Sequence, residues 1–141
     1  MTKILIVDDN PSVRAALRIC LKTKTDWIVC GEAENGESAI KLARSVRPDV
    51  VLLDYAMPVM NGLEAARALS SLAPECAILM YTMFAAPELA ELASSAGVRA
   101  VLSKEVNGIG AVMEAIEAIA SENADLVVSA ENQNRNASGC A

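Results

Sequence analysis

The chain has 141 residues, of which 53% are apolar and only 3% aromatic, which is enough for one domain built around an aliphatic core. Its 18 acidic and 12 basic residues give a net charge of −6, which argues against direct binding to nucleic acid or to an anionic membrane. No apolar run approaches the roughly 20 residues of a membrane span, and the amino terminus lacks a signal-peptide cleavage site, so we expect a cytoplasmic protein.

Five short aliphatic runs alternate with amphipathic segments. The runs predict buried strands over 3–9, 27–33, 49–54, 76–82 and 99–104. The other segments predict helices over 10–22, 35–46, about 63–69, from Pro87 onward, and 109–123. The inner face of the fourth helix is expected to carry Leu89, Leu92, Ala93 and Ala96. This alternation is typical of an α/β fold, in which helices cover both faces of a parallel sheet.

The composition changes near the end of the chain. Residues 1–122 are expected to form the domain, and the polar segment 123–141 a disordered tail. The four cysteines form no CxxC pair and the chain has no histidine, so we expect free thiols, three of them buried in apolar segments, and no zinc site. They are Cys20, Cys30, Cys76 and Cys140.

Polar residues stand at the carboxyl ends of four predicted strands. These residues are Asp8-Asp9, Asp54, Thr82 and Ser103-Lys104. Because the carboxyl ends of parallel strands meet at one edge of a sheet, we expect the three carboxylates to lie close together. At ~5 Å and an effective dielectric of ~20, each pair of carboxylates repels by about 3 kcal/mol, so a cation is expected among them. Oxygen ligands alone favour a hard divalent ion, which would be Mg²⁺ or, as an alternative, Mn²⁺.

The same residue types suit phosphoryl transfer. A carboxylate can attack phosphorus and hold the group as an aspartyl phosphate. The cation and a lysine can neutralise the oxygens of the transferring group, and a threonine hydroxyl can donate a hydrogen bond to one of them. Each residue alone has an ordinary alternative, because strand-end acids often cap helices and lysines are usually solvated. The combination is what predicts the chemistry.

The sequence resembles the receiver domain of bacterial two-component response regulators, of which the single-domain chemotaxis regulator is the familiar example. The resemblance rests on "ILIVDD", "LLDYAMPVMNG", "ILMYTM" and "AVLSK", and it covers residues 3 to about 122. It implies a three-layer, flavodoxin-like fold with a five-stranded parallel sheet in the order 2-1-3-4-5. The segments "TMF" and "AGVRAVLSK" are most similar to receivers that are joined to helix-turn-helix output domains.

The resemblance also implies a role for each acidic position. Asp54 would accept a phosphoryl group from a sensor histidine kinase, a phosphotransfer protein or a small phosphodonor. Asp9 is similar to the direct metal ligand and Asp8 to its water-mediated partner. Asp54 itself and the backbone carbonyl of Ala56 would complete the set of protein ligands.

Beyond the acids, Lys104 would contact the phosphoryl group, and Thr82 would close onto it. Three features depart from the family pattern, one of which is that Ala56 and Phe84 flank the site where many members carry polar groups. Val101 stands at the switch position, where the family usually has an aromatic residue, and Glu105 replaces the proline that often follows the lysine after a cis bond. A cis bond before a non-proline residue costs about 3 kcal/mol, which favours a trans bond here. The sequence alone leaves the geometry of the Lys104–Glu105 bond open between the cis form of the family and the trans form.

The function implied is a signalling switch and not an enzyme, with only self-phosphorylation and self-dephosphorylation. The downstream protein target would bind the face formed by the fourth helix, the fifth strand and the fifth helix, and phosphorylation would be able to drive homodimerisation. One alternative is a pseudo-receiver, an interaction module that works without phosphorylation. An aspartate-based phosphatase is disfavoured because Ala56 stands where those enzymes carry their general acid. The sequence leaves open which kinase acts on the domain and whether it is joined to an effector.

Overall fold

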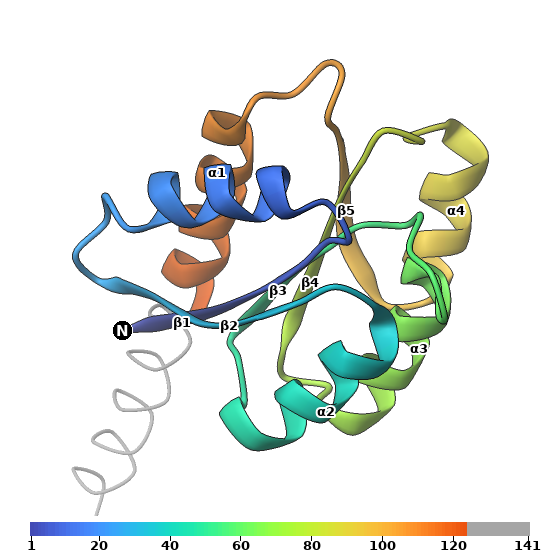
Figure 1. The fold of residues 1–141 in the computed structure, drawn as a ribbon, viewed down its shortest axis with the longest axis horizontal. Helices are drawn as coiled ribbons and strands as arrows, with labels where there is room; N and C mark the ends of the chain where they lie inside the picture. The colour runs from blue at the N-terminus through green and yellow to red at the C-terminus, as the bar shows by residue number, and fades with distance from the viewer. Residues whose placement is uncertain (124–141) are drawn as a thin grey trace, which may run out of the picture.

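The computed structural model describes residues 1–123, which form a parallel sheet with a helix after each strand (Figure 1). The strands are β1 (Thr2–Val7), β2 (Trp27–Ala33), β3 (Val50–Leu53), β4 (Ala77–Thr82) and β5 (Val98–Ser103). The labelled helices are α1 (Pro11–Leu21), α2 (Gly36–Val46), α3 (Gly62–Leu72) and α4 (Pro87–Ser95). A C-terminal helix covers residues 109–123. The predicted alternation of strands and helices is confirmed.

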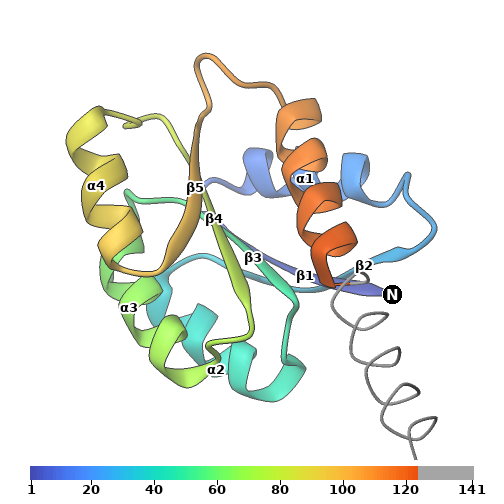
Figure 2. The same cartoon turned by 180° about the vertical axis from the view of Figure 1, so that it is seen from behind.

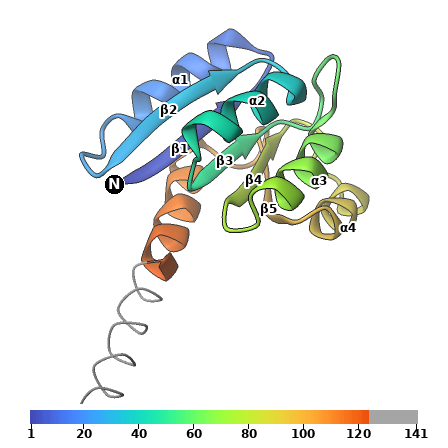
Figure 3. The same ribbon diagram turned by 90° about the horizontal axis from the view of Figure 1, so that it is seen from below.

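The sheet has the strand order β2-β1-β3-β4-β5, and every pair of neighbouring strands is parallel. The helices form a layer on each face: α1 and the C-terminal helix lie on one side, and α2, α3 and α4 on the other (Figures 2 and 3). All four residues of β3 are buried because helices cover both faces of this central strand. The flavodoxin-like three-layer fold and its strand order are therefore as predicted.

Two aliphatic clusters, one on each face of the sheet, form the core. Leu17 and Leu21 of α1 pack with Ile116 of the C-terminal helix on one face. Alanines and leucines of α2, α3 and α4, among them Ala43 and Leu69, pack on the other. Side chains alternate along each strand, so successive strand residues reach opposite clusters. This packing on both sides fixes the strand ends from which the site is built.

Asparagine caps set the start of three helices. The side-chain oxygen of Asn10 accepts from the amide of Ser12 at 2.9 Å, and Pro11 occupies the first turn of α1. Asn35 and Asn61 cap α2 and α3 in the same manner. The loops after β1 and β3, which carry the strand-end acids, therefore end at fixed helix starts.

The structure corrects one detail of the predicted core and extends one helix. Leu92 of α4 is 50% exposed, so the prediction that it faces inward was wrong. The buried line of this short helix runs through Leu89, Ala93 and the following Ala96, and Leu92 falls on its flank. The third helix continues to Leu72, beyond the predicted end at 69. The predicted tail lies outside the described residues, apart from residue 123, which is helical.

Two smaller expectations can be compared with residues 1–123. Cys20, Cys30 and Cys76 are free thiols, as predicted, but only Cys76 is buried, and Cys20 and Cys30 are half-buried. Cys140 lies outside the described range. Within these residues no helix has the length and apolar character needed to cross a lipid bilayer.

Candidate functional site

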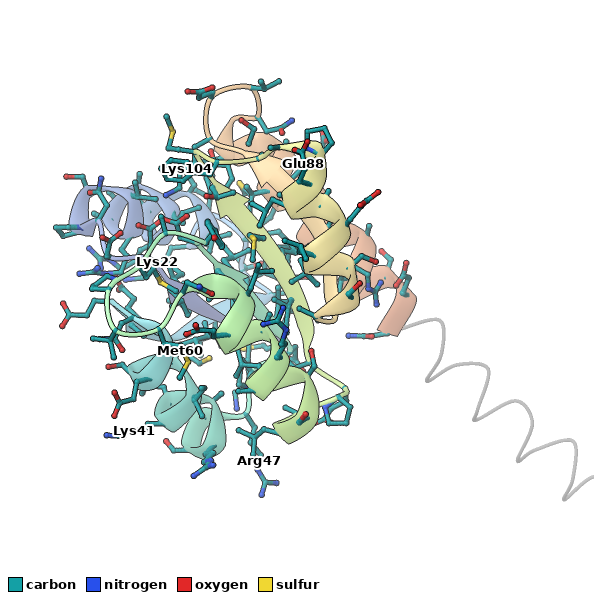
Figure 4. All side chains as sticks on the ribbon, turned by 90° about the vertical axis from the view of Figure 1, so that its right-hand side faces the viewer. Lys22, Lys41, Arg47, Met60, Glu88 and Lys104 are labelled. Atoms are coloured by element: carbon teal, nitrogen blue, oxygen red, sulfur yellow. The ribbon has the colours of Figure 1, made fainter. Side chains whose placement is uncertain are left out.

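The structure brings the polar strand ends together at one edge of the sheet. Asp8 follows β1 and Asp54 follows β3, and these two strands are hydrogen-bonded neighbours. The amide of Asp54 donates to the carbonyl of Val7 at 3.0 Å, so backbone pairing sets the two aspartates side by side. Figure 4 shows Lys104 at this end of the molecule and Arg47, which follows α2, at the opposite end.

Three carboxylates form an acidic cluster at this edge. Asp8, Asp9 and Asp54 each offer one oxygen, and these oxygens lie within 4.8 Å of one another. Asp8 and Asp54 are only 2% and 7% exposed, whereas Asp9 is open to solvent. The predicted convergence of the three acids is thus found in the structure, with the two buried members beneath an exposed one.

The two buried carboxylates, Asp8 and Asp54, accept hydrogen bonds in the same pattern. One oxygen of each accepts a backbone amide: Asn10 donates to Asp8 Oδ1 at 2.9 Å, and Tyr55 donates to Asp54 Oδ1 at 2.7 Å. The other oxygen of each accepts from Lys104, whose Nζ lies 2.6 Å from Asp8 Oδ2 and 3.2 Å from Asp54 Oδ2. The backbone amides fix how each carboxylate is turned, and the lysine bridges them.

Burial and charge act in opposite directions on these groups. Burial raises the pKa of Asp8, helped by the nearby Asp54 charge, and the hydrogen bonds from Lys104 and Asn10 offset only part of this rise. For Lys104, burial alone lowers the pKa, but the hydrogen bonds and charges of Asp8 and Asp54 outweigh it, so the pKa of the ammonium is raised. The lysine therefore stays protonated at neutral pH as the counter-charge of the cluster.

Thr82, the last residue of β4, is completely buried. Its hydroxyl oxygen accepts from the amide of Phe84 at 3.3 Å, and its carbonyl accepts from the amide of Lys104 at 2.9 Å. Since the oxygen is used as an acceptor, the hydroxyl hydrogen is available for donation. Thr82 and Lys104 are thus linked through the pairing of β4 with β5.

The loop after Asp54 depends on Gly62, the first residue of α3. A Cβ at this position would lie 2.3 Å from the carbonyl oxygen of Asp54, so only glycine fits. The amide of Gly62 also donates to the carbonyl of Tyr55 at 2.8 Å. The turn into α3 therefore passes directly against the backbone of Asp54.

Val59 in the same loop has a positive φ of 70°, which is unusual for a β-branched residue. The amide of Met60 donates across it to the carbonyl of Pro58 at 2.7 Å, and Figure 4 shows Met60 beside the start of α3. This three-residue turn directs the chain from Asp54 into α3.

Two of the departures from the family pattern, Val101 and the Lys104–Glu105 bond, take clear positions. Val101 pairs with Met80 and packs, half-buried, against the cluster shared by the sheet and α2, α3 and α4. The Lys104–Glu105 bond is trans, as is every peptide bond among residues 1–123. Of the two geometries left open by the sequence, the structure therefore has the one that avoids a costly cis bond.

Sequence reasoning missed Arg14 on α1. Its guanidinium donates to the backbone carbonyl of Asp8 at 2.5 Å, and its Nε lies 3.5 Å from the carboxylate of Glu32 on β2. Arg14 therefore braces the loop that carries Asp8 and Asp9. The helical pattern placed this residue in the first turns of α1, but no local signal connected it with β2.

Comparisons with known proteins identify the family of the chain. The family described as the response regulator receiver domain matches residues 4–117. A putative transcriptional regulator of Pseudomonas aeruginosa is 36% identical over 107 residues, which are 76% of this chain and 51% of the relative. The transcriptional regulatory protein YdfI of Bacillus subtilis is 48% identical over 65 residues, which are 46% of this chain and 30% of the relative. The chain thus spans about half of the first of these curated relatives and less than a third of the second.

A solved structure gives the same result for the fold. A two-component response regulator of the LuxR family from Aurantimonas sp. SI85-9A1 superimposes with a TM-score of 0.80 at 31% sequence identity. The match covers 86% of this chain and 87% of that one. Since the family match covers well over half of the sequence and the structure has the expected strand order, this chain belongs to the response regulator receiver domain family.

Proposed function

We propose that this receiver domain accepts a phosphoryl group on Asp54, with a divalent cation bound beside it, and that phosphorylation changes its affinity for a protein partner. The observation that carries the proposal is the position of Asp54 Oδ2, which lies 3.2 Å from Lys104 Nζ within a cluster of three carboxylates. A nucleophilic oxygen, a metal-binding set of acids and a fixed positive charge therefore occupy one small region.

The acidic cluster fits a hard divalent cation. Three carboxylate oxygens within 4.8 Å of one another can be brought onto one ion by small side-chain rotations, and all the donors are oxygens. Mg²⁺ is the expected ion, with Mn²⁺ as a substitute of similar preference. We assign Asp9 and Asp54 as direct ligands and Asp8 as a partner through water. The backbone carbonyl of Ala56, two residues after Asp54, would complete the protein ligands.

The residues of the site divide the chemistry among them. Asp54 Oδ2 attacks the phosphorus of the donor; a new phosphorus–oxygen bond forms, and the bond to the leaving group breaks with its electron pair. Lys104 stabilises the negative charge on the transferring oxygens, and the Thr82 hydroxyl donates to one of them once the group is in place. The bound cation supplies further positive charge at the same oxygens.

Partners follow from the proposed chemistry and from the longer relatives. A sensor histidine kinase or a phosphotransfer protein would donate the phosphoryl group. The output would be read on the face formed by α4, β5 and the C-terminal helix, near which Phe84 and Val106 are exposed at 60% and 82%. Phosphorylation would be able to favour a homodimer, and the match to transcriptional regulators suggests an effector that controls transcription.

Val101 favours one second candidate, a pseudo-receiver that binds its partner without phosphorylation. The usual aromatic switch residue is missing at this position, and a valine packed in the core cannot swing between two pockets as a ring does. The complete set of acids, lysine and threonine supports the phosphorylated switch over this candidate. Beryllofluoride, which mimics a phosphoryl group, separates them: binding with Mg²⁺ supports the switch, and no binding supports the pseudo-receiver.

Acetyl phosphate provides the direct test. Intact-mass spectrometry after incubation with acetyl phosphate and Mg²⁺ should show the addition of one phosphoryl group to the wild-type domain and none to Asp54→Ala. Chelation of Mg²⁺ should abolish the modification. A modification that persists in Asp54→Ala would contradict the assignment, and steady hydrolysis of a generic phosphoester would contradict the expectation that the domain is not an enzyme.

A further inference from the structure

Tyr81, the residue before Thr82, reaches the loop that carries Lys104. Successive residues of β4 face opposite sides of the sheet, so Tyr81 packs in the core shared with α1 and the C-terminal helix. Its ring is buried, with 7% exposure, and its hydroxyl donates to the backbone carbonyl of Asn107 at 2.9 Å. A buried phenol with its hydroxyl aimed at a loop carbonyl is a specific contact and not general packing.

Asn107 in turn closes the loop upon itself. Its side-chain oxygen accepts from the backbone amide of Ser103 at 3.0 Å, and its backbone amide donates to the carbonyl of Ser103 at 2.7 Å. The hydroxyl of Ser103 accepts from the amides of Glu105 and Val106 at 3.1 and 3.3 Å. Residues 103–107 therefore form a closed turn, and Lys104 is the residue of this turn whose side chain reaches the acidic cluster.

This turn lacks the device that often shapes it in related receivers. The residue after the lysine is Glu105 and the bond before it is trans, so neither a proline ring nor a cis bond restricts the backbone. An exposed loop of this kind would be free to move the lysine unless other contacts hold it. Tyr81 and Asn107 supply those contacts from the core side.

We infer that Tyr81 and Asn107 are positioning residues that hold Lys104 in place for phosphoryl transfer. The inference rests on the proposed function, because it is Asp54 chemistry that Lys104 serves. Tyr81 is also covalently joined to Thr82, and the carbonyl of Thr82 accepts from the amide of Lys104 at 2.9 Å. Residues 103–107 are therefore linked to β4 both by the side chain of Tyr81 and by the backbone of Thr82.

Tyr81→Phe is the decisive variant, because it removes one hydroxyl and keeps the ring. The loss of about one net hydrogen bond should slow phosphorylation by acetyl phosphate roughly 3- to 10-fold at saturating Mg²⁺. The dissociation constant of Mg²⁺ should not rise, because the acids themselves are untouched and a displaced Lys104 would compete less for them. Asn107→Ala should give the same pattern by a second route.

Ser70→Ala is the matched control. It also removes a half-buried hydroxyl that donates to a backbone carbonyl, that of Ala96 at 2.9 Å, but it lies near the start of β5 and away from the acidic cluster. This variant should be phosphorylated at the wild-type rate. An equal slowing in Ser70→Ala would mean that the loss of any such bond has this effect, and would overturn the inference.

A double-mutant cycle separates positioning of Lys104 from a general structural effect. In a Lys104→Met background the change Tyr81→Phe should cause no further slowing, because the group that Tyr81 positions is already gone. If the two changes act independently, so that their effects on the activation free energy add, Tyr81 does not act through Lys104 and the inference fails.

Amide hydrogen exchange in the unphosphorylated domain gives a reading that does not depend on phosphoryl transfer. Tyr81→Phe should speed exchange at Glu105 and Asn107 by roughly 3- to 10-fold, and Ser70→Ala should leave these amides unchanged. Unchanged exchange in Tyr81→Phe would overturn the inference. Failure of the wild-type domain to accept a phosphoryl group would instead overturn the proposed function, so the two failures are distinguishable.

Discussion

The ammonium of Lys104 donates a 2.6 Å hydrogen bond to Oδ2 of Asp8, shorter than the 3.2 Å bond that it makes to Asp54. The lysine therefore pairs with an acid of the proposed metal-binding set as well as with the acid proposed to carry phosphate. A divalent cation would compete with the lysine for the same carboxylate charge, whereas a phosphoryl group on Asp54 would attract both.

Lys104→Met should consequently tighten Mg²⁺ binding but slow phosphorylation. The dissociation constant of Mg²⁺ should fall several-fold, because a competing positive charge has been removed, and phosphorylation by acetyl phosphate should slow roughly tenfold or more. Calorimetric titration and intact-mass kinetics measure the two. Lys41→Met is the control, since Lys41 is exposed on α2 and should affect neither. Weaker Mg²⁺ binding in Lys104→Met would contradict this competition.

Asp8 should reduce stability at neutral pH. Burial raises the pKa of its carboxyl group above the ordinary 3.8, so the folded chain binds this proton more tightly than the unfolded chain does. The protonated carboxyl group of Asp8 thus stabilises the folded chain fully below pH 3.8, and this contribution is lost as the pH rises through the raised pKa of the folded state. Asp8→Asn should raise the free energy of unfolding by about 1 kcal/mol at pH 7 without divalent ions, and by less near pH 4.

Urea denaturation at the two pH values measures this difference. Lys104 keeps Asp54 as a partner in the variant, so no buried ammonium is left unpaired. Asp26→Asn, a change at an exposed position after α1, should leave stability nearly unchanged at both pH values. Addition of Mg²⁺ should stabilise the wild-type domain more than Asp8→Asn. A variant that is less stable than wild type at pH 7 would show that the bond to Lys104 outweighs burial.

Gly62→Ala should be strongly destabilising. The added Cβ would meet the carbonyl oxygen of Asp54 at 2.3 Å, so the start of α3 or the backbone of Asp54 must move. We expect a loss of about 2–4 kcal/mol in the free energy of unfolding, measured by urea denaturation, together with weaker Mg²⁺ binding. Gly110→Ala is the matched control in the C-terminal helix, where the new methyl meets no atom within 4 Å. That change should be neutral or stabilising by up to about 1 kcal/mol.

The phosphorylated domain should lose its phosphoryl group slowly. Ala56 is two residues after Asp54, the amide of Phe84 donates to the hydroxyl oxygen of Thr82, and neither side chain has a polar group that can orient an attacking water. We expect the modified protein to persist for minutes or longer in Mg²⁺ after the phosphodonor is removed, as followed by intact-mass spectrometry. Ala56→Asn should shorten the lifetime roughly tenfold by supplying an amide that positions water. A wild-type lifetime of seconds would contradict the prediction.

Much of this molecule was predictable from local patterns. The aliphatic run ending at Asp54 and the runs ending at Asp8 and Lys104 have the length and composition of strands buried on both faces, so their type and boundaries could be read within a residue or two. Because parallel strands end at one edge, the residues that meet there followed from the same patterns. The α/β class and the membership of the acidic cluster therefore followed from local patterns, whereas the strand order and the family were implied by the resemblance of the motifs to receiver domains.

The tertiary structure decided the contacts between distant segments. The bridge from Lys104 to both buried acids, the bond from Tyr81 to Asn107 and the passage of Gly62 against Asp54 join residues that no local period connects. The outward position of Leu92 likewise depends on how α4 sits on the sheet. Hydrophobic spacing specifies which side of an element is buried, whereas distances between side chains depend on strand register and loop paths, which are fixed only when the whole core is packed.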